Sequence, residues 1–293
     1  MCLHQLLVDD LKIQIKKNII MKLIESSATI IPQESGVTGL YKQIELAGRL
    51  CYKSEDKICE GSAIKMVDNL VKRGHGSPLE HGTVYMTLKW WQIGKKLKYM
   101  FNKYSKIKKF KYVTTNYRVL VENNWLKDII FMCEPTENHE KRISVKVNCA
   151  IAITREFNRH RVKSICESST RYCNYSLDKF GNELTFVIPD WVKIRMNELS
   201  EDDFADCQDI AVKCWWEFMR YTEHEYLNLI KLGLKPQEAR SVLALDTATE
   251  VMYTAFVSDW KHFFKLRTAV GAHPDARAIA CPLEAEFKLN NYI

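Results

Sequence analysis

The sequence predicts an α+β protein that folds as a single compact domain, in which a mixed or antiparallel sheet is flanked by long helices. Three observations predict this class. The chain has 293 residues, 46% of them apolar, which is enough to bury a large core. Alternating or β-branched runs are interspersed with longer runs at helical spacing, without a regular βαβ rhythm. Charged residues make up 27%, with only 11 Gly and 7 Pro, which excludes a disordered chain.

The first 20 residues are interpreted as an N-terminal extension of unknown role, because Met21 offers a second plausible beginning for a domain that spans 21–293. Asp9 and Asp10 interrupt the first apolar run, which argues against a signal peptide. No run approaches the roughly 18 apolar residues that a membrane span requires. We therefore expect a soluble cytoplasmic protein without a membrane partner.

The elements that follow are two helices, a turn and a strand. Apolar residues recur at helical spacing over 40–51 and over 62–72, and Gly74 ends the second pattern. The segment 75–81 contains the Pro and Gly of a turn. Polar residues then alternate with Val84, Met86, Leu88 and Trp90, which predicts a half-buried strand. The polar groups of the turn would cluster where this strand begins.

The middle of the chain alternates strand and helix. Residues 142–153 have the pattern of a strand, which is expected to pass into a helix over 154–161. A second strand is expected over 184–189, where it ends at a proline.

The C-terminal third is predicted to be mainly helical. A long amphipathic helix is expected over 202–232, and a shorter one begins near Pro236. Residues 247–257 are interpreted as a strand, although 250–256 could also be helical. Ser258 is expected to cap a further helix, whose stripe at i, i+3, i+4 and i+7 consists of Trp260, Phe263, Phe264 and Arg267.

The stretch 95–111 holds eight lysines interleaved with the aromatic residues Tyr99, Phe101, Tyr104 and Phe110. The chain as a whole has 43 Lys and Arg against 36 Asp and Glu, a formal charge of +7. Lysines beside aromatic residues are typical of surfaces that bind single-stranded nucleic acid. A run of charge is more often the solvated face of an amphipathic helix or loop, and this interpretation is favoured. Nucleic acid is therefore not expected as the main partner.

Ten cysteines are spread over the chain without any C-x-x-C pair, so the spacings of zinc ribbons and thioredoxin-like motifs are absent and no metal site is predicted. A chain of this size does not need disulfides for stability. Thiols in apolar stretches, such as Cys149 in 149–153, are interpreted as small core residues. This cysteine usage favours a reducing compartment.

The most unusual cluster lies between residues 159 and 172. Within fourteen residues it combines permanent positive charge, hydroxyl groups and one carboxylate, contributed by Arg159, His160, Arg161, Ser164, Glu167, Ser168, Ser169, Arg171 and Tyr172. Guanidinium groups recognise phosphate with two hydrogen bonds at once, which lysine cannot do. On a helix, Arg159 and Arg161 would point about 200° apart and would therefore serve different ligands or subunits. The structural alternative is a basic helix end with surface ion pairs, which weakens when the whole set is considered.

At this cluster the sequence resembles the flavin-dependent thymidylate synthases. Arg159-His160-Arg161, seven residues and then Ser169 resemble the family's signature. Two further blocks match in the same order. The segment 75–81 resembles its H-x-[ST]-x-x-E-H turn, and 233–240 with 260–267 resembles its C-terminal half. The resemblance spans roughly residues 22–290, and three ordered motifs are far more specific than one.

The resemblance implies a methyltransferase of nucleotide biosynthesis that converts dUMP to dTMP. It implies a homotetramer with FAD bound between subunits. Methylenetetrahydrofolate would supply the carbon, and FAD reduced by NADPH would carry the hydride. The partners would thus be dUMP, the folate and NADPH, and no cysteine would act as nucleophile.

The resemblance also assigns residues. Its FAD positions correspond to His75, Ser77, Glu80, Arg159, His160, Arg161, Glu167 and His262. Its dUMP positions correspond to Glu156, Arg159, Glu167, Ser168, Ser169, Thr170, Arg171, Arg240 and Arg267. Arg267 and Ser169 are the catalytic candidates. Ser169 would lie near the reacting pyrimidine, and Arg267 would polarise the uracil ring by favouring ionisation at N3.

Four positions depart from the family pattern. Glu156 stands where many members have Gln, and Cys166 replaces a common Asn. Phe256 and Ser258 replace an Asn and an Arg that help to hold FAD, which suggests a paralogue that binds nucleotide without catalysis as a further alternative. An insertion at about 90–148 separates the first motif from the second and contains the lysine-rich stretch. The resemblance assigns this insertion no role.

Overall fold

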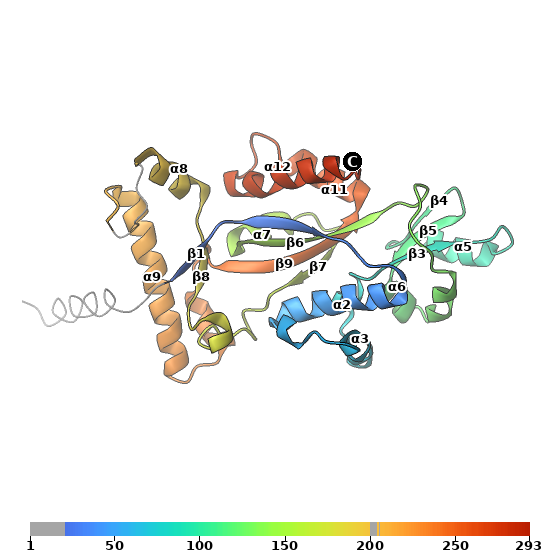
Figure 1. Ribbon diagram of the computed structural model, residues 1–293, viewed down its shortest axis with the longest axis horizontal. Coiled ribbons are helices and arrows are strands. Elements are labelled where there is room, and N and C mark those ends of the chain that lie inside the picture. The colour runs from blue at the N-terminus through green and yellow to red at the C-terminus, as the bar shows by residue number, and fades with distance from the viewer. Residues whose placement is uncertain (1–20, 200–203, 205) are drawn as a thin grey trace, which may run out of the picture. The chain divides into compact units, whose positions relative to one another are not determined.

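The computed structural model describes residues 21–199, 204 and 206–293 (Figure 1). The expected extension over 1–20 lies outside these residues. The described chain clusters into two compact units: unit 1 holds 21–27, 148–157 and 169–249, and unit 2 holds 28–147, 158–168 and 250–293. Helices accompany a parallel strand pair and several antiparallel pairs, so the predicted α+β class with mixed or antiparallel sheets is confirmed.

The largest sheet has four strands in the order β2-β6-β9-β7. Its strands are β2 (Ser27–Ile31), β6 (Arg142–Ala150), β9 (Ala248–Phe256) and β7 (Ser164–Glu167). β7 runs antiparallel to β9, with Ser164 opposite Thr254. The boundary between the units falls inside β6 and β9. Of the two assignments considered for the 247–257 region, the strand is the one observed.

Helices cover both faces of this sheet in unit 2 (Figure 1). On one side lie α2 (Gly36–Tyr52) and α3 (Ser62–Lys72), which confirm the two helices expected there. Their buried stripes pack on each other through residues that include Leu40, Ile44, Val67 and Leu70. On the other side lie α11 (Val257–Arg267) and α12 (Pro274–Leu289), whose aromatic contact includes Trp260 and Phe287.

A second sheet in unit 2 is antiparallel, in the order β3-β5-β4. It consists of β3 (Thr83–Thr87), β5 (Tyr112–Asn116) and β4 (Lys106–Lys108). The short helix α4 (Gly76–Leu79) precedes it, and α5 (Ile93–Met100) and α6 (Tyr117–Glu122) are joined to its strands. Two 3-10 turns, η1 (Glu55–Lys57) and η2 (Leu126–Phe131), complete the unit.

Unit 1 is built on a parallel pair of strands, β1 (Lys22–Ile24) and β8 (Thr185–Val187). Its helices are α7 (Ile151–Phe157), α8 (Asp190–Leu199), α9 (Ile210–Lys231) and α10 (Pro236–Ala239), with the turns η3 (Asp178–Phe180) and η4 (Arg240–Val242). Its core gathers Phe186, Val192, Met219 and Tyr226.

Three predicted helices have wrong ends. The helix expected over 154–161 is α7, which begins at Ile151 and ends at Phe157. The long helix begins at Ile210 and not at residue 202, because the Asp209 carboxylate accepts hydrogen bonds from the backbone amides of residues 211 and 212. Ser258 does not cap α11, which begins at Val257. The amide of Ser258 instead donates to the Glu140 carboxylate at 3.1 Å.

The strand after the turn is not half-buried as predicted. Val84 and Met86 are buried on one face, but Thr83 and Tyr85 on the other face are also buried. The reason is that Arg142 lies against this second face, where its guanidinium donates to Thr83 Oγ1 and its backbone bonds to Tyr85 OH. Trp90, expected in the buried series, lies beyond the end of β3 and is 78% exposed.

The guanidinium of Arg142 joins three elements of unit 2. It donates to the carbonyl oxygen of Glu80 at 3.0 Å, to Thr83 Oγ1 at 3.2 Å and to Ser164 Oγ at 2.9 Å. The Arg142 side chain is buried. The three described groups that accept its hydrogen bonds, one carbonyl oxygen and two hydroxyls, carry no charge. Burial lowers the pKa of Arg142 to about 10, so it is still charged at neutral pH.

Arg142→Met is expected to destabilise the folded chain by about 3–5 kcal/mol, because it leaves several buried acceptors without a donor. The free energy of unfolding, measured in urea, checks this value. Lys65→Met on the exposed face of α3 is the control and should change it by no more than about 0.5 kcal/mol. Equal effects of the two substitutions would contradict the role of Arg142.

Candidate functional site

A cavity of about 260 Å³ in unit 2 collects five of the predicted site residues. They are Arg159, His160, Arg161, His262 and Arg267. The first three lie in the connection between α7 and β7, and the last two lie on α11. The apolar part of the wall includes Trp260, Phe263 and Leu266. Segments about a hundred residues apart in the sequence thus form one lining.

The helical geometry assumed for the arginine pair is wrong. Arg159 and Arg161 follow the end of α7 and have no helical backbone, so the 200° separation does not apply to them. Both line the same cavity. The two guanidinium groups are therefore available to one ligand.

Arg267 is held by His160 within this cavity. Arg267 Nε donates to His160 Nε2 at 3.0 Å. A guanidinium cannot accept a hydrogen bond, so this nitrogen of His160 must be unprotonated. Burial lowers the pKa of His160 to about 4, with further lowering from Lys163, Arg267 and His262. His160 is therefore neutral at physiological pH, and it orients the arginine without adding charge.

The cavity has an excess of positive charge. Arg159, Arg161, Lys163 and Arg267 line it together with one carboxylate, that of Asp259. Burial raises the pKa of Asp259 above its usual range. Such a lining suits an anionic ligand with a planar ring, because guanidinium groups bind phosphate and the aromatic residues supply flat contact surfaces.

The predicted turn residues lie elsewhere in unit 2, around α4. Ser77 Oγ donates to the carbonyl oxygen of Ile165 at 3.0 Å, which connects the turn to β7. Glu80 pairs with Arg118 at 2.6 Å. His75 stands at the position before α4. The turn is therefore fixed beside the strand that ends at Glu167.

Glu167 and Ser168 follow the cavity-lining segment in the sequence. Glu167 is the last residue of β7, and Ser168 is buried directly after it. Ser168 Oγ accepts a hydrogen bond from the amide of Glu250 at 3.2 Å. The amide of Ser168 donates to the carbonyl oxygen of Glu250 at 2.8 Å, which continues the pairing of β7 with β9 by one residue.

The other predicted substrate residues belong to unit 1. Arg240 Nη1 donates to Thr170 Oγ1 at 3.3 Å, across 70 positions of sequence. The amide of Arg171 donates to Ser169 Oγ at 3.4 Å. Glu156 lies on α7. Unit 1 therefore brings Arg240 to the 169–171 loop, as expected if these residues share one ligand.

Two charged residues of the cavity, Lys163 and Asp259, were not predicted from the sequence. Lys163 lies two positions after Arg161, and its Nζ is 3.5 Å from the centroid of the Tyr253 ring. Asp259 precedes His262 and Phe263 by three and four positions, which is the spacing of one helix face. That spacing could have indicated Asp259, whereas the contact of Lys163 with β9 had no signal in the sequence.

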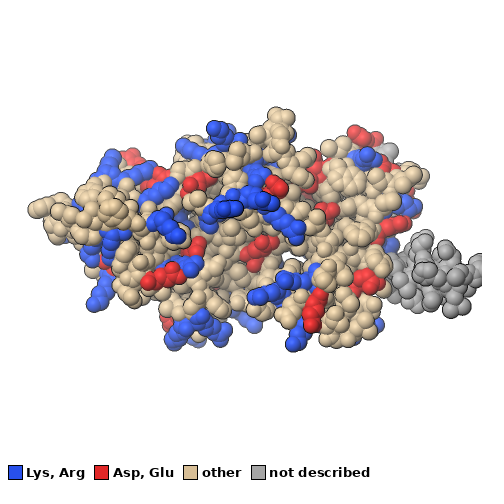
Figure 2. All heavy atoms as spheres, turned by 180° about the vertical axis from the view of Figure 1, so that it is seen from behind, with Lys and Arg blue, Asp and Glu red and all other residues tan. Residues whose placement is uncertain are grey.

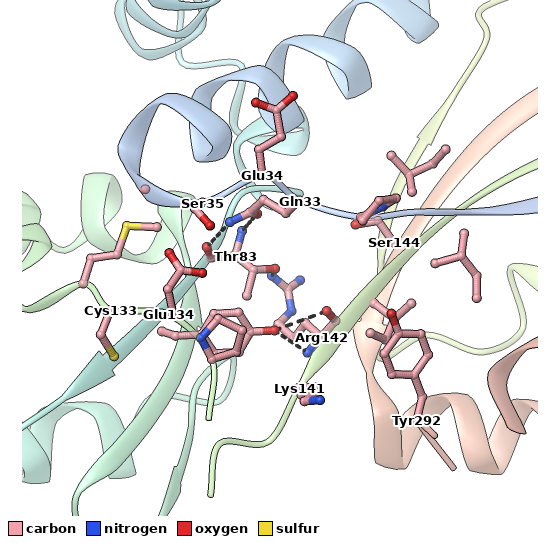
Figure 3. A pocket seen from close by; sticks show the side chains of 18 residues that line it. Gln33, Glu34, Ser35, Thr83, Cys133, Glu134, Lys141, Arg142, Ser144 and Tyr292 are labelled. Atoms are coloured by element: carbon pink, nitrogen blue, oxygen red, sulfur yellow. Dashed lines mark hydrogen bonds between the residues drawn. The ribbon is translucent and has the colours of Figure 1, made fainter. Parts of the chain in front are cut away.

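A second cavity, of about 210 Å³, contains none of the predicted residues (Figure 3). Several of its polar groups bond to one another. Gln33 Nε2 donates to the Thr83 carbonyl oxygen at 2.9 Å and its Oε1 accepts from the Thr83 amide at 2.8 Å. Tyr85 OH bonds to the backbone of Arg142. These contacts connect β3 to β6 and to the segment that follows β2, so the cavity is interpreted as structural.

Comparison with known families decides the classification. Residues 108–289, well over half of the chain, match the sequence profile described as thymidylate synthase complementing protein. The chain belongs to this family. The matched range contains the cavity-lining 159–163 and 259–267 segments, whereas the turn at 75–81 precedes it. The resemblance inferred from the motifs is confirmed.

Relatives in this family are flavin-dependent thymidylate synthases. That of Pyrococcus furiosus is 31% identical over 139 residues, which cover 47% of this chain and 51% of the relative. That of Thermococcus onnurineus is 29% identical over 142 residues, 48% of this chain and 52% of the relative. That of Kosmotoga olearia is 27% identical, over 48% and 60%. The chain spans about half the length of the first two.

A solved structure of a UMP/dUMP methylase, PolB from Streptomyces cacaoi bound with 5-Br dUMP, is similar at 19% sequence identity. The match covers 92% of this chain and 93% of the other, with a TM-score of 0.44. A score of this size supports no inference about the present chain.

No helix among the described residues is both long and apolar enough to cross a membrane. In the same residues, no group of three His, Cys, Asp or Glu side chains is arranged to hold a metal ion.

Acidification is expected to destabilise the chain through His81. This residue is fully buried, its Nδ1 lies 2.8 Å from Thr254 Oγ1, and burial lowers its pKa from 6.5 to about 3. Below about pH 6.5 the unfolded state binds a proton that the folded state does not, so stability falls with pH until about pH 3. Each pKa unit corresponds to about 1.4 kcal/mol, which gives a loss of about 3 kcal/mol at pH 4.5.

Urea unfolding at about pH 7 and about pH 4.5 measures this loss. His81→Asn keeps a side-chain group near Thr254 but does not titrate, so the difference between the two pH values should shrink by about 3 kcal/mol in this variant. An unchanged difference would show that other groups cause the acid sensitivity.

Proposed function

We propose that this chain is a flavin-dependent thymidylate synthase that converts dUMP to dTMP. In this proposal methylenetetrahydrofolate supplies the carbon, and FAD reduced by NADPH completes the methyl group. The main support is the cavity that Arg159, His160, Arg161 and Arg267 line together. The chain also belongs to the thymidylate synthase complementing protein family. The homotetramer and the cytoplasmic location belong to the same proposal.

The cavity residues fit a flavin. Its lining combines guanidinium groups, which suit a pyrophosphate, with aromatic residues, which suit a flat ring system. Arg159, His160, Arg161 and His262 would hold the cofactor here, and His75, Ser77, Glu80 and Glu167 would hold it from the turn and from β7. When bound, FAD supplies the hydride chemistry. The protein binds, orients and excludes water.

Arg267 is assigned the polarising role. Its guanidinium stays protonated and can stabilise negative charge that develops on a uracil ring ionised at N3. The hydrogen bond to neutral His160 fixes its direction without competing for that charge. A protonated His160 would repel Arg267, so the low pKa of His160 is needed to keep the hydrogen bond between the two side chains.

The dUMP phosphate and sugar are assigned to the loop of unit 1 and its neighbours. Arg240 and Arg171 would bind the phosphate, and Ser169 would lie near the reacting pyrimidine. The bond between Arg240 and Thr170 supports this grouping. Glu156, Arg159, Glu167 and Ser168 complete the proposed substrate set.

A non-catalytic paralogue is the alternative suggested by Phe256 and Ser258. The ammonium group of Lys106 lies beside both of these residues. Lys106 Nζ donates to Ser258 Oγ at 2.5 Å and lies 4.3 Å from the centroid of the Phe256 ring. In this proposal Lys106, a lysine of the predicted insertion that also lies 4.0 Å from the Asp259 carboxylate, supplies the charge that an arginine at position 258 would carry. This observation favours a retained flavin site.

The proposal predicts a yellow purified protein that releases tritium from C5-labelled dUMP when methylenetetrahydrofolate and NADPH are present. Arg267→Ala is expected to abolish this release while leaving the oligomer and its flavin content intact. A colourless protein that cannot be reconstituted with FAD would refute the assignment. Normal turnover in Arg267→Ala would refute only the role of that residue.

Lys106→Ala is expected to weaken FAD binding by about tenfold, because a charge-assisted hydrogen bond contributes about 1.5–3 kcal/mol. Flavin fluorescence during titration of the apoprotein measures this dissociation constant. Lys65→Ala, which removes an exposed lysine from α3, is the matched control and should have no effect. Equal FAD affinity in the wild type and Lys106→Ala would remove Lys106 from the flavin site.

A further inference from the structure

Residues 89–111 form a surface of unit 2 that the proposed reaction does not use, apart from Lys106. We call it the basic-aromatic surface. It holds nine lysines and no Asp or Glu. It comprises α5, β4 and the loops beside them. At the left edge of Figure 2, blue Lys and Arg side chains lie beside uncharged residues drawn in tan.

The aromatic rings of this surface point to solvent. A solvated amphipathic helix would bury its rings and expose its lysines. Here Trp90 is 78% exposed, Trp91 56% and Phe101 79%, and Tyr104 and Phe110 are also exposed. Within this surface Tyr99 is buried, and so is the lysine Lys96. The solvated helix or loop favoured from the sequence stays a prediction, and the loops beside α5 expose aromatic rings as well as lysines.

Part of the positive charge on this surface has no acidic partner. Lys95 and Lys98 pair with Asp128, and Lys108 pairs with Glu140. Lys89 and Lys103 form no ion pair with the described carboxylates. Their Nζ atoms instead lie 5.0 Å from the centroid of Trp91 and 4.8 Å from that of Tyr104. Cations and flat rings thus alternate along the surface.

A neighbouring cavity of about 470 Å³ adds hydrogen-bonding groups to the rings. Phe101 and Tyr104 line it together with the amides of Asn102 and Asn123. Its carboxylates, Glu80 and Glu122, are both paired with Arg118. Flat rings beside amides match the faces and edges of nucleobases.

We propose that the basic-aromatic surface binds single-stranded nucleic acid, with lysines on the phosphates and exposed rings stacked on unpaired bases. A second copy of the chain is disfavoured as the occupant of this surface. Symmetric pairing of the same surface on two copies would place lysines against lysines, which repel each other. A lipid bilayer would also accept lysines and rings, but the amide-lined cavity beside Phe101 favours bases over acyl chains. Apart from Lys106, this surface shares no residue with the proposed dUMP and flavin sites.

Fluorescence anisotropy of the full-length protein with labelled oligo(dT) and oligo(U) of about 30 nucleotides tests the proposal. Both strands should bind more tightly than a duplex of the same length, because paired bases cannot stack on the rings. The affinity should fall steeply between about 50 and 200 mM salt.

Variants separate stacking from charge. Trp90→Ala with Phe101→Ala should weaken binding by about tenfold or more, with the salt slope unchanged. Lys89→Gln with Lys103→Gln should lower that slope by about 1.4, since each phosphate contact on a single strand contributes about 0.7. The matched controls are Trp191→Ala with Phe218→Ala for exposed rings, and Lys57→Gln with Lys65→Gln for exposed charge. Both controls should bind like the wild type.

Photocrosslinking of the wild type to 4-thiouridine-substituted oligo(U) maps the site without any substitution. Crosslinks should fall within residues 89–111. Absence of binding at about 50 mM salt, crosslinks elsewhere, or equal loss of binding in the control variants would overturn the proposal. So would competition by dUMP, or binding to phosphatidylserine vesicles in place of oligonucleotides. None of these outcomes would affect tritium release from dUMP, so failure here is distinct from failure of the proposed enzyme activity.

Discussion

The buried guanidinium of Arg142 is the contact on which the organisation of unit 2 depends. One planar group satisfies the carbonyl oxygen after α4, a hydroxyl of β3 and the hydroxyl at the start of β7. Burying an isolated charge is costly, so the three acceptors must keep their positions for the charge to be tolerated. This requirement fixes the turn that holds Ser77 and Glu80 beside the strand that ends at Glu167.

From that fixed strand the chemistry of the cavity follows. β7 begins directly after the 159–163 segment, and its partner β9 runs straight into α11. Pairing of β7 with β9 therefore sets the separation of His160 from Arg267, which meet at 3.0 Å. The low pKa of His160 arises from the same burial and from the surrounding cations. The electrostatic state of the site is a consequence of strand pairing.

The sequence predicted what depends on local periodicity or on ordered motifs. The helices at 36–52 and 62–72 were recognisable because their apolar spacing matches one structure, whereas the pattern of β9 left strand and helix both open over 250–256. The ordered motifs indicated Arg159, His160, Arg161, His262 and Arg267, which share a cavity. Contacts across long sequence separations were not predictable. Arg142 reaches Thr83 over 59 positions, and Lys106 reaches Ser258 over 152. The exposed Trp90 was misplaced because alternation cannot show where a strand ends.

The link between Lys106 and Ser258 joins the basic-aromatic surface to the helix that carries His262 and Arg267. Linkage between two binding sites is reciprocal: a ligand that changes the affinity of a second site by some factor is itself affected by the same factor. If an occupant of residues 89–111 displaced Lys106, it would weaken cofactor affinity at α11, and the bound cofactor would weaken that occupant equally. The ammonium group of Lys106 would then couple the affinities of the two binding sites.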